Sequence, residues 1–157
     1  MTFPQRAEPL VEPNDPNISE DAPTGDGLRV EPARAPVLVV LVVEDDPTHR
    51  ELLVEMVNLW GYEALAVASA EEAELAVKRR PVFAAIVDVI LPGRSGPSLM
   101  SRLRIKYPEA ILIGISALGD AATARKCKGL GADIFIGKPV MPDELAKALR
   151  SKHQSWH

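Results

Sequence analysis

Acidic, basic and hydroxyl residues follow short apolar runs at four places in the sequence. Each run is rich in valine or isoleucine, and the residues that follow are Glu44, Asp45, Asp46, Asp88, Ser116 and Lys138. Carboxylates held close together repel one another unless a cation neutralises them. The sequence has no cluster of histidines and cysteines with the spacing of a zinc site. The carboxylate oxygens therefore indicate a hard ion such as Mg²⁺ or Mn²⁺.

A phosphoryl group would find both a nucleophile and binding groups among these residues. Asp88 is the best candidate nucleophile because it stands alone after its apolar run, and a carboxylate can form an aspartyl phosphate. Lys138 would offer a point charge and Ser116 a hydroxyl donor to the phosphoryl oxygens. These residues therefore indicate phosphoryl chemistry beside a metal ion.

Alternating apolar runs and helical patterns predict the elements that would position these side chains. Runs too short for helices predict five strands, at 37–43, 63–68, 82–87, 111–115 and 132–136. Helices are expected from Pro47 to before Gly61, from Ser69 to before Pro81, from the loop 89–96 through Tyr107, and at 120–129 and 142–152. This alternation predicts an α/β fold with a five-stranded parallel sheet covered by helices on both faces. The carboxyl ends of parallel strands meet at one edge, where ligands bind.

Local signals mark the start of two of these helices. Asp46 and Pro47 are typical of a helix N-terminus, and Ser69 with Glu72 predicts a capping box. The apolar stripe expected to face the sheet from the first helix is Leu52, Leu53, Met56, Leu59 and Trp60.

The composition of the 157-residue chain separates a tail from a folded domain. Residues 1–36 hold seven of the 14 prolines and seven acids, which predicts a disordered tail there and a folded domain at 37–157. The domain carries 15 acidic and 15 basic residues, so no general attraction to nucleic acid or to an anionic membrane is expected. One cysteine, no apolar run of membrane length and no secretory signal favour the cytoplasm.

Four sequence blocks resemble the receiver domain of response regulators in two-component signalling. The blocks are VVLVVEDDP at 39–47, IVDVILPG at 86–93, ISA at 115–117 and IGKP at 136–139. They occur in the expected order and spacing, and the resemblance covers about residues 37–152. It implies a doubly wound, flavodoxin-like sheet with strand order 2-1-3-4-5. Because the sequence ends at His157, without room for a DNA-binding helix-turn-helix, a stand-alone receiver domain is expected.

The resemblance implies a phosphoacceptor and a set of metal ligands. Asp88 looks like the residue that receives the phosphoryl group. Glu44 and Asp45 look like the acidic pair that holds Mg²⁺ (or Mn²⁺) together with Asp88, and the backbone carbonyl of Ile90 looks like a further ligand. In the family, the phosphoryl donor is a histidine kinase or a phosphotransfer protein.

The resemblance also implies a switch. Ser116 looks like the hydroxyl that moves toward the phosphoryl group, and Phe135 looks like the aromatic residue that turns inward with it. Phe135 also fits a plain core position on a buried strand. Lys138 looks like the phosphate-pairing lysine and is expected to precede a cis peptide at Pro139. Output is expected on the face of the fourth helix, fifth strand and fifth helix, at roughly 120–152, toward a downstream protein or a second copy.

The leading hypothesis is thus a phosphorylation-dependent switch that is not an enzyme beyond its own phosphorylation and dephosphorylation. One alternative is a pseudo-receiver, an interaction module that is never phosphorylated. The intact Asp88, Lys138 and Asp45 argue against it, but Ser95 and the tail at 1–36 keep it open. The other alternative is a phosphohydrolase with an aspartyl-phosphate intermediate. Such an enzyme would need a second carboxylate two residues after Asp88, and Ile90 at that position argues against it.

Two further expectations concern single residues. Ile90 and Leu118 each follow a key residue by two positions, and two bulky apolar side chains there should exclude water and lengthen the life of the phosphorylated state. No catalytic role is assigned to His49, His153 or His157, because no carboxylate or serine constellation is expected around them.

Overall fold

Strands and helices alternate through the part of the chain described by the structure, a computed structural model, namely residues 36–91, 93 and 96–151. The strands are β1 (Val39–Val43), β2 (Glu63–Val67), β3 (Ala84–Asp88), β4 (Ile111–Ser116) and β5 (Ile134–Gly137). The helices are α1 (Pro47–Leu59), α2 (Ala70–Arg79), α3 (Gly96–Lys106), α4 (Ala121–Gly129) and α5 (Pro142–Arg150). The strands pair in parallel in the order β2-β1-β3-β4-β5, which confirms the expected doubly wound fold. The tail predicted at 1–36 lies outside the described residues, apart from Pro36.

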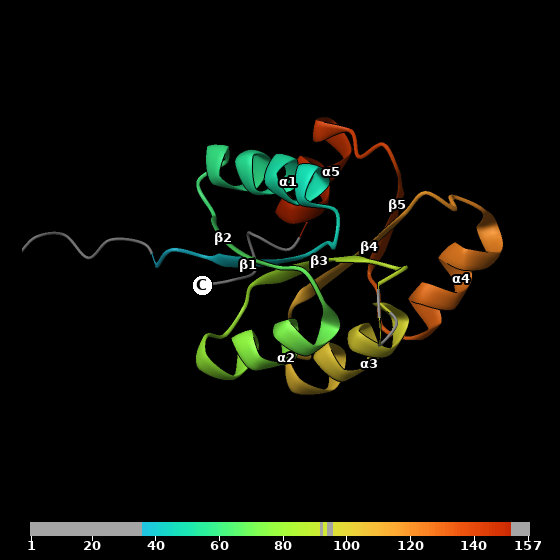
Figure 1. The fold of residues 1–157 in the computed structure, drawn as a ribbon, viewed down its shortest axis with the longest axis horizontal. Helices are drawn as coiled ribbons and strands as arrows, with labels where there is room; N and C mark the ends of the chain where they lie inside the picture. Colours follow the sequence, from blue (N-terminus) through green and yellow to red (C-terminus); the bar gives the residue numbers. More distant parts are fainter. Residues whose placement is uncertain (1–35, 92, 94–95, 152–157) are drawn as a thin grey trace, which may run out of the picture. The chain divides into compact units, whose positions relative to one another are not determined.

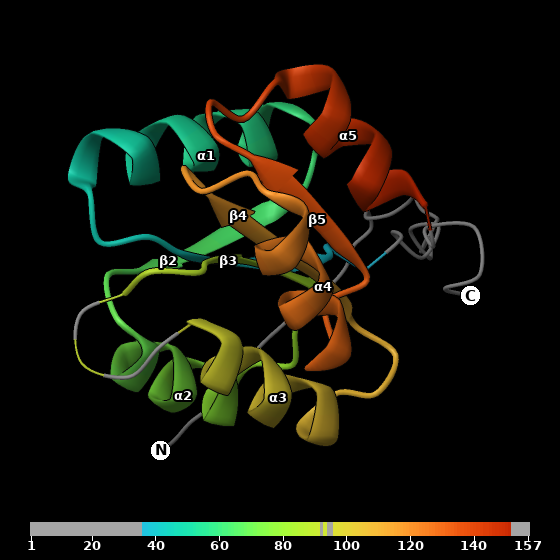
Figure 2. The same ribbon diagram turned by 90° about the vertical axis from the view of Figure 1, so that its right-hand side faces the viewer.

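The sheet is covered on both faces, by α1 and α5 on one side and by α2, α3 and α4 on the other (Figures 1 and 2). Successive residues of a strand point to opposite faces. Val40 and Val42 of β1 therefore pack into the core beneath α1 and α5, whereas Leu41 and Val43 pack on the opposite side. Burial on both faces explains why β1 is an unbroken apolar run.

The caps predicted for α1 and α2 are confirmed. Asp46 accepts a hydrogen bond from the backbone N–H of Thr48 at 3.0 Å. Ser69 accepts one from the N–H of Glu72 at 3.2 Å, and the Glu72 side chain accepts in return from Ala68, one residue before the cap, at 2.9 Å. Both helices therefore begin where their local sequence predicts.

The apolar stripe predicted for α1 is wrong at two positions. Leu52 and Leu59 are 50% and 83% exposed, whereas Val57 is fully buried beside Leu53 and Met56. The helix contacts the sheet along a narrower strip with spacings of three and four residues, and the two exposed leucines lie on its flank.

Predicted and observed element ends differ by at most two residues within the described part of the chain. β1 begins at Val39 rather than at 37, and β5 begins at Ile134, the first residue that pairs with β4, rather than at 132. The last residue expected in α5, Lys152, lies outside the described residues. Among the described helices, none has the length and apolar character needed to cross a membrane.

Candidate functional site

The parallel register brings the predicted site residues to one edge of the sheet. Pairing of β1 with β3 puts Glu44 and Asp88 at neighbouring positions where these strands end. Pairing of β4 with β5 places Ser116 beside Gly137, directly before Lys138. Residues far apart in the sequence thus meet because their strands end together.

Lys138 reaches from the end of β5 across β4 to the end of β3. Adjacent strands are about 4.8 Å apart, so this reach of roughly 10 Å requires a long side chain. The Lys138 Nζ donates a hydrogen bond to Asp88 Oδ2 at 2.7 Å and lies 2.9 Å from Glu44 Oε1. Glu44 is 1% exposed, Asp88 is 5% exposed and the Lys138 side chain is 15% exposed, so the three groups form a largely buried ionic cluster.

Burial and charge together set the protonation of this cluster. Desolvation raises the pKa of Glu44; Lys138 partly offsets this effect, and the neighbouring charge of Asp88 adds to it. Burial alone would lower the pKa of Lys138, but its contacts with Asp88 and Glu44 outweigh burial and raise that pKa. The lysine therefore stays charged and holds the two carboxylates close together.

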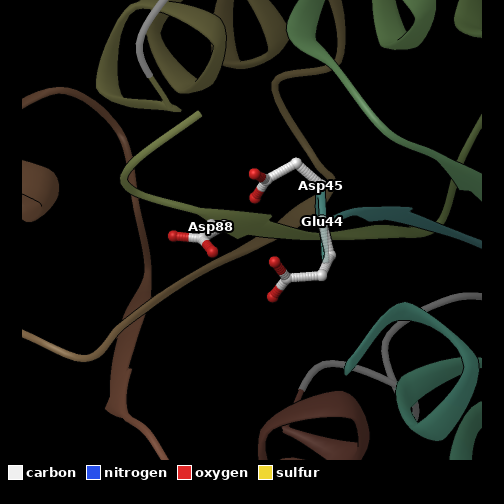
Figure 3. A group of neighbouring side chains, drawn as sticks. All are labelled: Glu44, Asp45 and Asp88. Atoms are coloured by element: carbon white, nitrogen blue, oxygen red, sulfur yellow. The ribbon is translucent and has the colours of Figure 1, made fainter. Parts of the chain in front are cut away.

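Three carboxylates can hold a divalent ion here. Glu44, Asp45 and Asp88 each offer an oxygen within 4.8 Å of the others, and Figure 3 shows them grouped where β1 and β3 end. Within the described part of the chain, the buried Glu44 Oε1 has no hydrogen-bond donor of good geometry, although the ammonium of Lys138 is its ion-pair neighbour. Oxygen atoms at this spacing, with one acid exposed, fit Mg²⁺ or Mn²⁺, which completes its shell with water and substrate oxygens.

Two backbone turns fix the predicted nucleophile and the predicted switch hydroxyl. The N–H of Ile90 donates to Asp88 Oδ1, and the N–H of Leu118 donates to Ser116 Oγ, each at 2.9 Å. Ser116 is fully buried on β4, and among the described residues it makes no hydrogen bond to Asp88. The two side chains therefore lie on neighbouring strands and are held separately, each by its own loop.

Phe135 and the peptide after Lys138 complete the predicted set. Phe135 is partly buried on β5 and packs against the core beneath α2, α3 and α4. The Lys138–Pro139 peptide bond is cis, as expected from the resemblance. The switch role of Phe135 stays a prediction.

Two residues near the cluster were missed by sequence reasoning. His49 Nδ1 lies 3.9 Å from Glu44 Oε1 and 3.8 Å from Asp46 Oδ2, so the expectation that this histidine has no carboxylates around it is wrong. The three-residue spacing of Asp46 and His49 on a helix was the available signal. Arg50 donates hydrogen bonds to the backbone carbonyls of Glu44 and Asp45, a contact that no spacing rule predicts. His153 and His157 lie outside the described residues.

Comparison with known proteins agrees with this geometry. Residues 40–150 match the family described as the response regulator receiver domain. A cyclic di-GMP phosphodiesterase of Thermotoga maritima is 38% identical over 66% of this chain and 27% of its own length. The transcriptional regulatory protein AruR of Pseudomonas aeruginosa is 34% identical over 71% of this chain and 48% of its own length. The crystal structure of a putative response regulator from Chloroflexus aurantiacus is 32% identical with a TM-score of 0.68, covering 75% of this chain and 97% of that one.

This chain spans less than half the length of each of these two curated relatives. The chain matches 27% and 48% of the lengths of the two curated relatives, so it is similar to one part of each. The similarity therefore concerns the receiver domain and not the remaining parts of those proteins.

Proposed function

The chain belongs to the response regulator receiver domain family, and from this premise we propose that it is a signalling switch controlled by phosphorylation of Asp88. The observation that carries the proposal is the buried cluster in which Lys138 Nζ lies 2.7 Å from Asp88 Oδ2 beside two further acids. The proposal places the protein in the cytoplasm. It assigns the protein no turnover beyond the gain and loss of its own phosphoryl group.

Asp88 acts as the nucleophile in this proposal. A carboxylate oxygen attacks the phosphorus of a phosphohistidine, the P–N bond breaks, and the leaving imidazole nitrogen takes up a proton. Lys138, already hydrogen-bonded to Asp88, pairs with the phosphoryl oxygens, and Ser116 on the neighbouring strand donates its hydroxyl to them.

Divalent-ion binding supports this transfer. Glu44, Asp45, Asp88 and the backbone carbonyl of Ile90 would hold Mg²⁺ or Mn²⁺, which neutralises charge that develops on the phosphoryl oxygens. Without such a cation, the negative charge of the acids would repel an incoming phosphoryl group.

The proposed donor is a histidine kinase or a phosphotransfer protein. Three apolar side chains beside the acidic edge are half exposed or more: Leu52 lines a pocket with Glu44 and Lys138, and Ile90 and Leu118 follow Asp88 and Ser116 by two residues. Exposed apolar residues around a charged site are typical of a surface that another protein covers. These exposed side chains support a protein donor that presents its phosphohistidine to Asp88.

The proposed output is a change in partner binding at α4, β5 and α5. A phosphoryl group adds charge and acceptor oxygens beside Lys138 and Ser116, which biases an existing two-state equilibrium. A hollow between β5 and α5 has apolar walls, including Ile134 and Phe135, and one side chain of each charge, Glu144 and Lys147. This mixture supports a protein partner or a second copy of the chain, rather than nucleic acid or a membrane.

Intact-mass spectrometry after incubation with acetyl phosphate and Mg²⁺ tests the proposal. The wild-type chain should gain the mass of one phosphoryl group, and Asp88→Asn should gain none. Asp143→Asn, which neutralises an exposed acid in the first turn of α5, is the matched control and should label like the wild type.

The same incubation, together with a phosphate-release assay on phosphate esters, separates the alternatives. Absence of an adduct in the wild type would favour the pseudo-receiver, in which the cluster serves structure alone. Rapid multiple turnover of phosphate esters would favour the aspartyl-phosphate phosphohydrolase. Either result would contradict the proposed switch.

A further inference from the structure

Arg50 of α1 binds the backbone of both residues of the acidic pair. Its Nη1 donates to the carbonyl oxygen of Glu44 at 3.0 Å and lies 3.4 Å from that of Asp45. Nη1 carries two N–H groups, which the planar guanidinium holds in fixed directions, so this one nitrogen can donate to both neighbouring carbonyls. The contact ties the first turn of α1 to the loop that follows β1.

Asp45 depends on such a contact more than the other two acids do. The ammonium of Lys138 holds the side chains of Glu44 and Asp88. The Asp45 side chain is exposed, and within the described ranges it makes no hydrogen bond. The backbone therefore sets the direction in which this side chain leaves the chain, and Arg50 binds the carbonyl of that backbone.

We infer that Arg50 is a positioning residue for the divalent-ion site, an inference that rests on the proposed function. By holding two successive carbonyls, the guanidinium fixes the peptide planes on both sides of Asp45. This aims the Asp45 carboxylate at the point that the oxygens of Glu44 and Asp88 share. Arg50 acts through the backbone and contacts neither the ion nor the phosphoryl group.

Charge and geometry predict opposite effects of changing Arg50. A cation near the acids repels a divalent ion, so a purely electrostatic role means that neutralising Arg50 tightens ion binding. A positioning role means that binding weakens, because the loop that carries Asp45 loses its support. Lysine keeps the charge, but its side chain is one bond shorter than the path to Nη1 and its ammonium is not held in a plane, so it should not hold both carbonyls.

Calorimetric titration of Mg²⁺ into the full chain measures this difference. We expect the Kd for Mg²⁺ to rise about tenfold in both Arg50→Gln and Arg50→Lys, the lower end of the effect of removing support from metal ligands. Arg79→Gln, which removes the same charge from an exposed residue at the C-terminal end of α2, should leave the Kd unchanged. Incubation of the wild-type chain with acetyl phosphate and Mg²⁺ tests the proposed function separately.

An unchanged or lower Kd in either Arg50 variant would overturn the inference, as would a wild-type chain that binds no Mg²⁺. Circular dichroism checks the fold of each variant, and Arg50→Lys alone decides the matter if Arg50→Gln does not fold. A wild-type chain that binds Mg²⁺ but forms no adduct would overturn the proposed function. The measured Kd for Mg²⁺ would then still decide the inference about Arg50.

Discussion

Glu44 is a buried acid whose position favours the ion site but opposes folding. Its carboxylate is buried at the end of β1, and that burial raises its pKa despite the ammonium of Lys138 at 2.9 Å. A buried charge of this kind opposes folding, yet it supplies an oxygen to the group that can bind a cation. The residue therefore favours cation binding but lowers the free energy of unfolding.

Glu44→Gln should make the metal-free protein more stable at neutral pH. An acid with a pKa raised in the folded state lowers the free energy of unfolding as pH rises above its ordinary value of 4.5. The variant should therefore gain about 1 kcal/mol at pH 7, within the range of single stabilising substitutions, and lose part of the pH dependence. Urea denaturation between pH 5 and 8 measures both effects. Glu51→Gln, at an exposed position on α1, is the control, and a less stable Glu44→Gln would contradict the account.

Ile90 and Leu118 should set the lifetime of the phosphorylated state. Their backbone N–H groups bind Asp88 and Ser116, so their side chains flank the site, where they are more than half exposed. We expect Ile90→Asn/Leu118→Glu to speed phosphate release about tenfold, or roughly 1.4 kcal/mol in activation free energy, because polar side chains can orient water. A release time course after removal of acetyl phosphate measures this.

The matched control for that experiment changes the same residue types elsewhere. Ile105→Asn/Leu59→Glu alters two side chains that are 79% and 83% exposed on α3 and α1. This pair should release phosphate at the wild-type rate. Equal rates in all three proteins would refute the water-exclusion hypothesis.

At the scale of the elements, α3 approaches the site through a residue without a side chain. A Cβ at Gly96, the first residue of α3, would lie 2.1 Å from the backbone oxygen of Asp88. The N–H of Gly96 donates to the carbonyl of Val89 at 3.2 Å, which holds the helix against the end of β3. The approach of α3 to the phosphoacceptor strand therefore requires glycine.

Gly96→Ala should destabilise the domain, whereas Gly129→Ala should not. The first change forces α3 away from Asp88 and should cost about 2 kcal/mol, within the range for overpacked positions. The second has no atoms within 4 Å of its new Cβ at the end of α4, and the higher helix propensity of alanine should leave stability equal or up to about 1 kcal/mol higher. Urea denaturation compares them, and equal losses in both variants would contradict the role given to Gly96.

The elements themselves could be predicted from the sequence because their signals are local. The runs of β1 and β4 and the caps Asp46 and Ser69 depend on neighbouring residues only. The prediction of the buried residues of α1 failed because it used only the spacing of apolar residues. That Val57 is buried in place of Leu59 depends on how the helix lies on the sheet.

The candidate site could be predicted in part for the same reason. The ends of apolar runs located its acids, its hydroxyl and its lysine, because parallel strands end at one edge. Arg50 could not be found in this way. Its contact with two carbonyls follows from the path of the loop after β1, which the residue types do not encode.

At the scale of the whole molecule, the edge of the sheet and the surface formed by α4, β5 and α5 serve different tasks in the proposed switch. The donor meets the acidic edge, while α4, β5 and α5 carry the response. Moving a two-state population from 1:99 to 99:1 takes about 5.5 kcal/mol of differential stabilisation. Several charge-assisted hydrogen bonds from Lys138 and Ser116 to one phosphoryl group can supply free energy of this order.

Phosphorylation should slow amide hydrogen exchange in α4 and β5. New bonds to Ser116 and Lys138 tighten the ends of β4 and β5, and α4 follows β4 directly. Exchange mass spectrometry with and without acetyl phosphate should show slower exchange there and no change in α2. Asp88→Asn should show neither effect, and a response confined to α2 would contradict the proposed output face.

The most direct test of the central claim is to identify the residue that receives the phosphoryl group. Borohydride reduces an aspartyl phosphate to homoserine, which peptide mass spectrometry locates in the sequence. After labelling with acetyl phosphate and Mg²⁺, the account predicts homoserine at position 88 and at no other acid. Homoserine at another aspartate such as Asp45, the longer alcohol that a reduced glutamyl phosphate leaves at a residue such as Glu44, or a labelled protein without homoserine at position 88 would contradict the account.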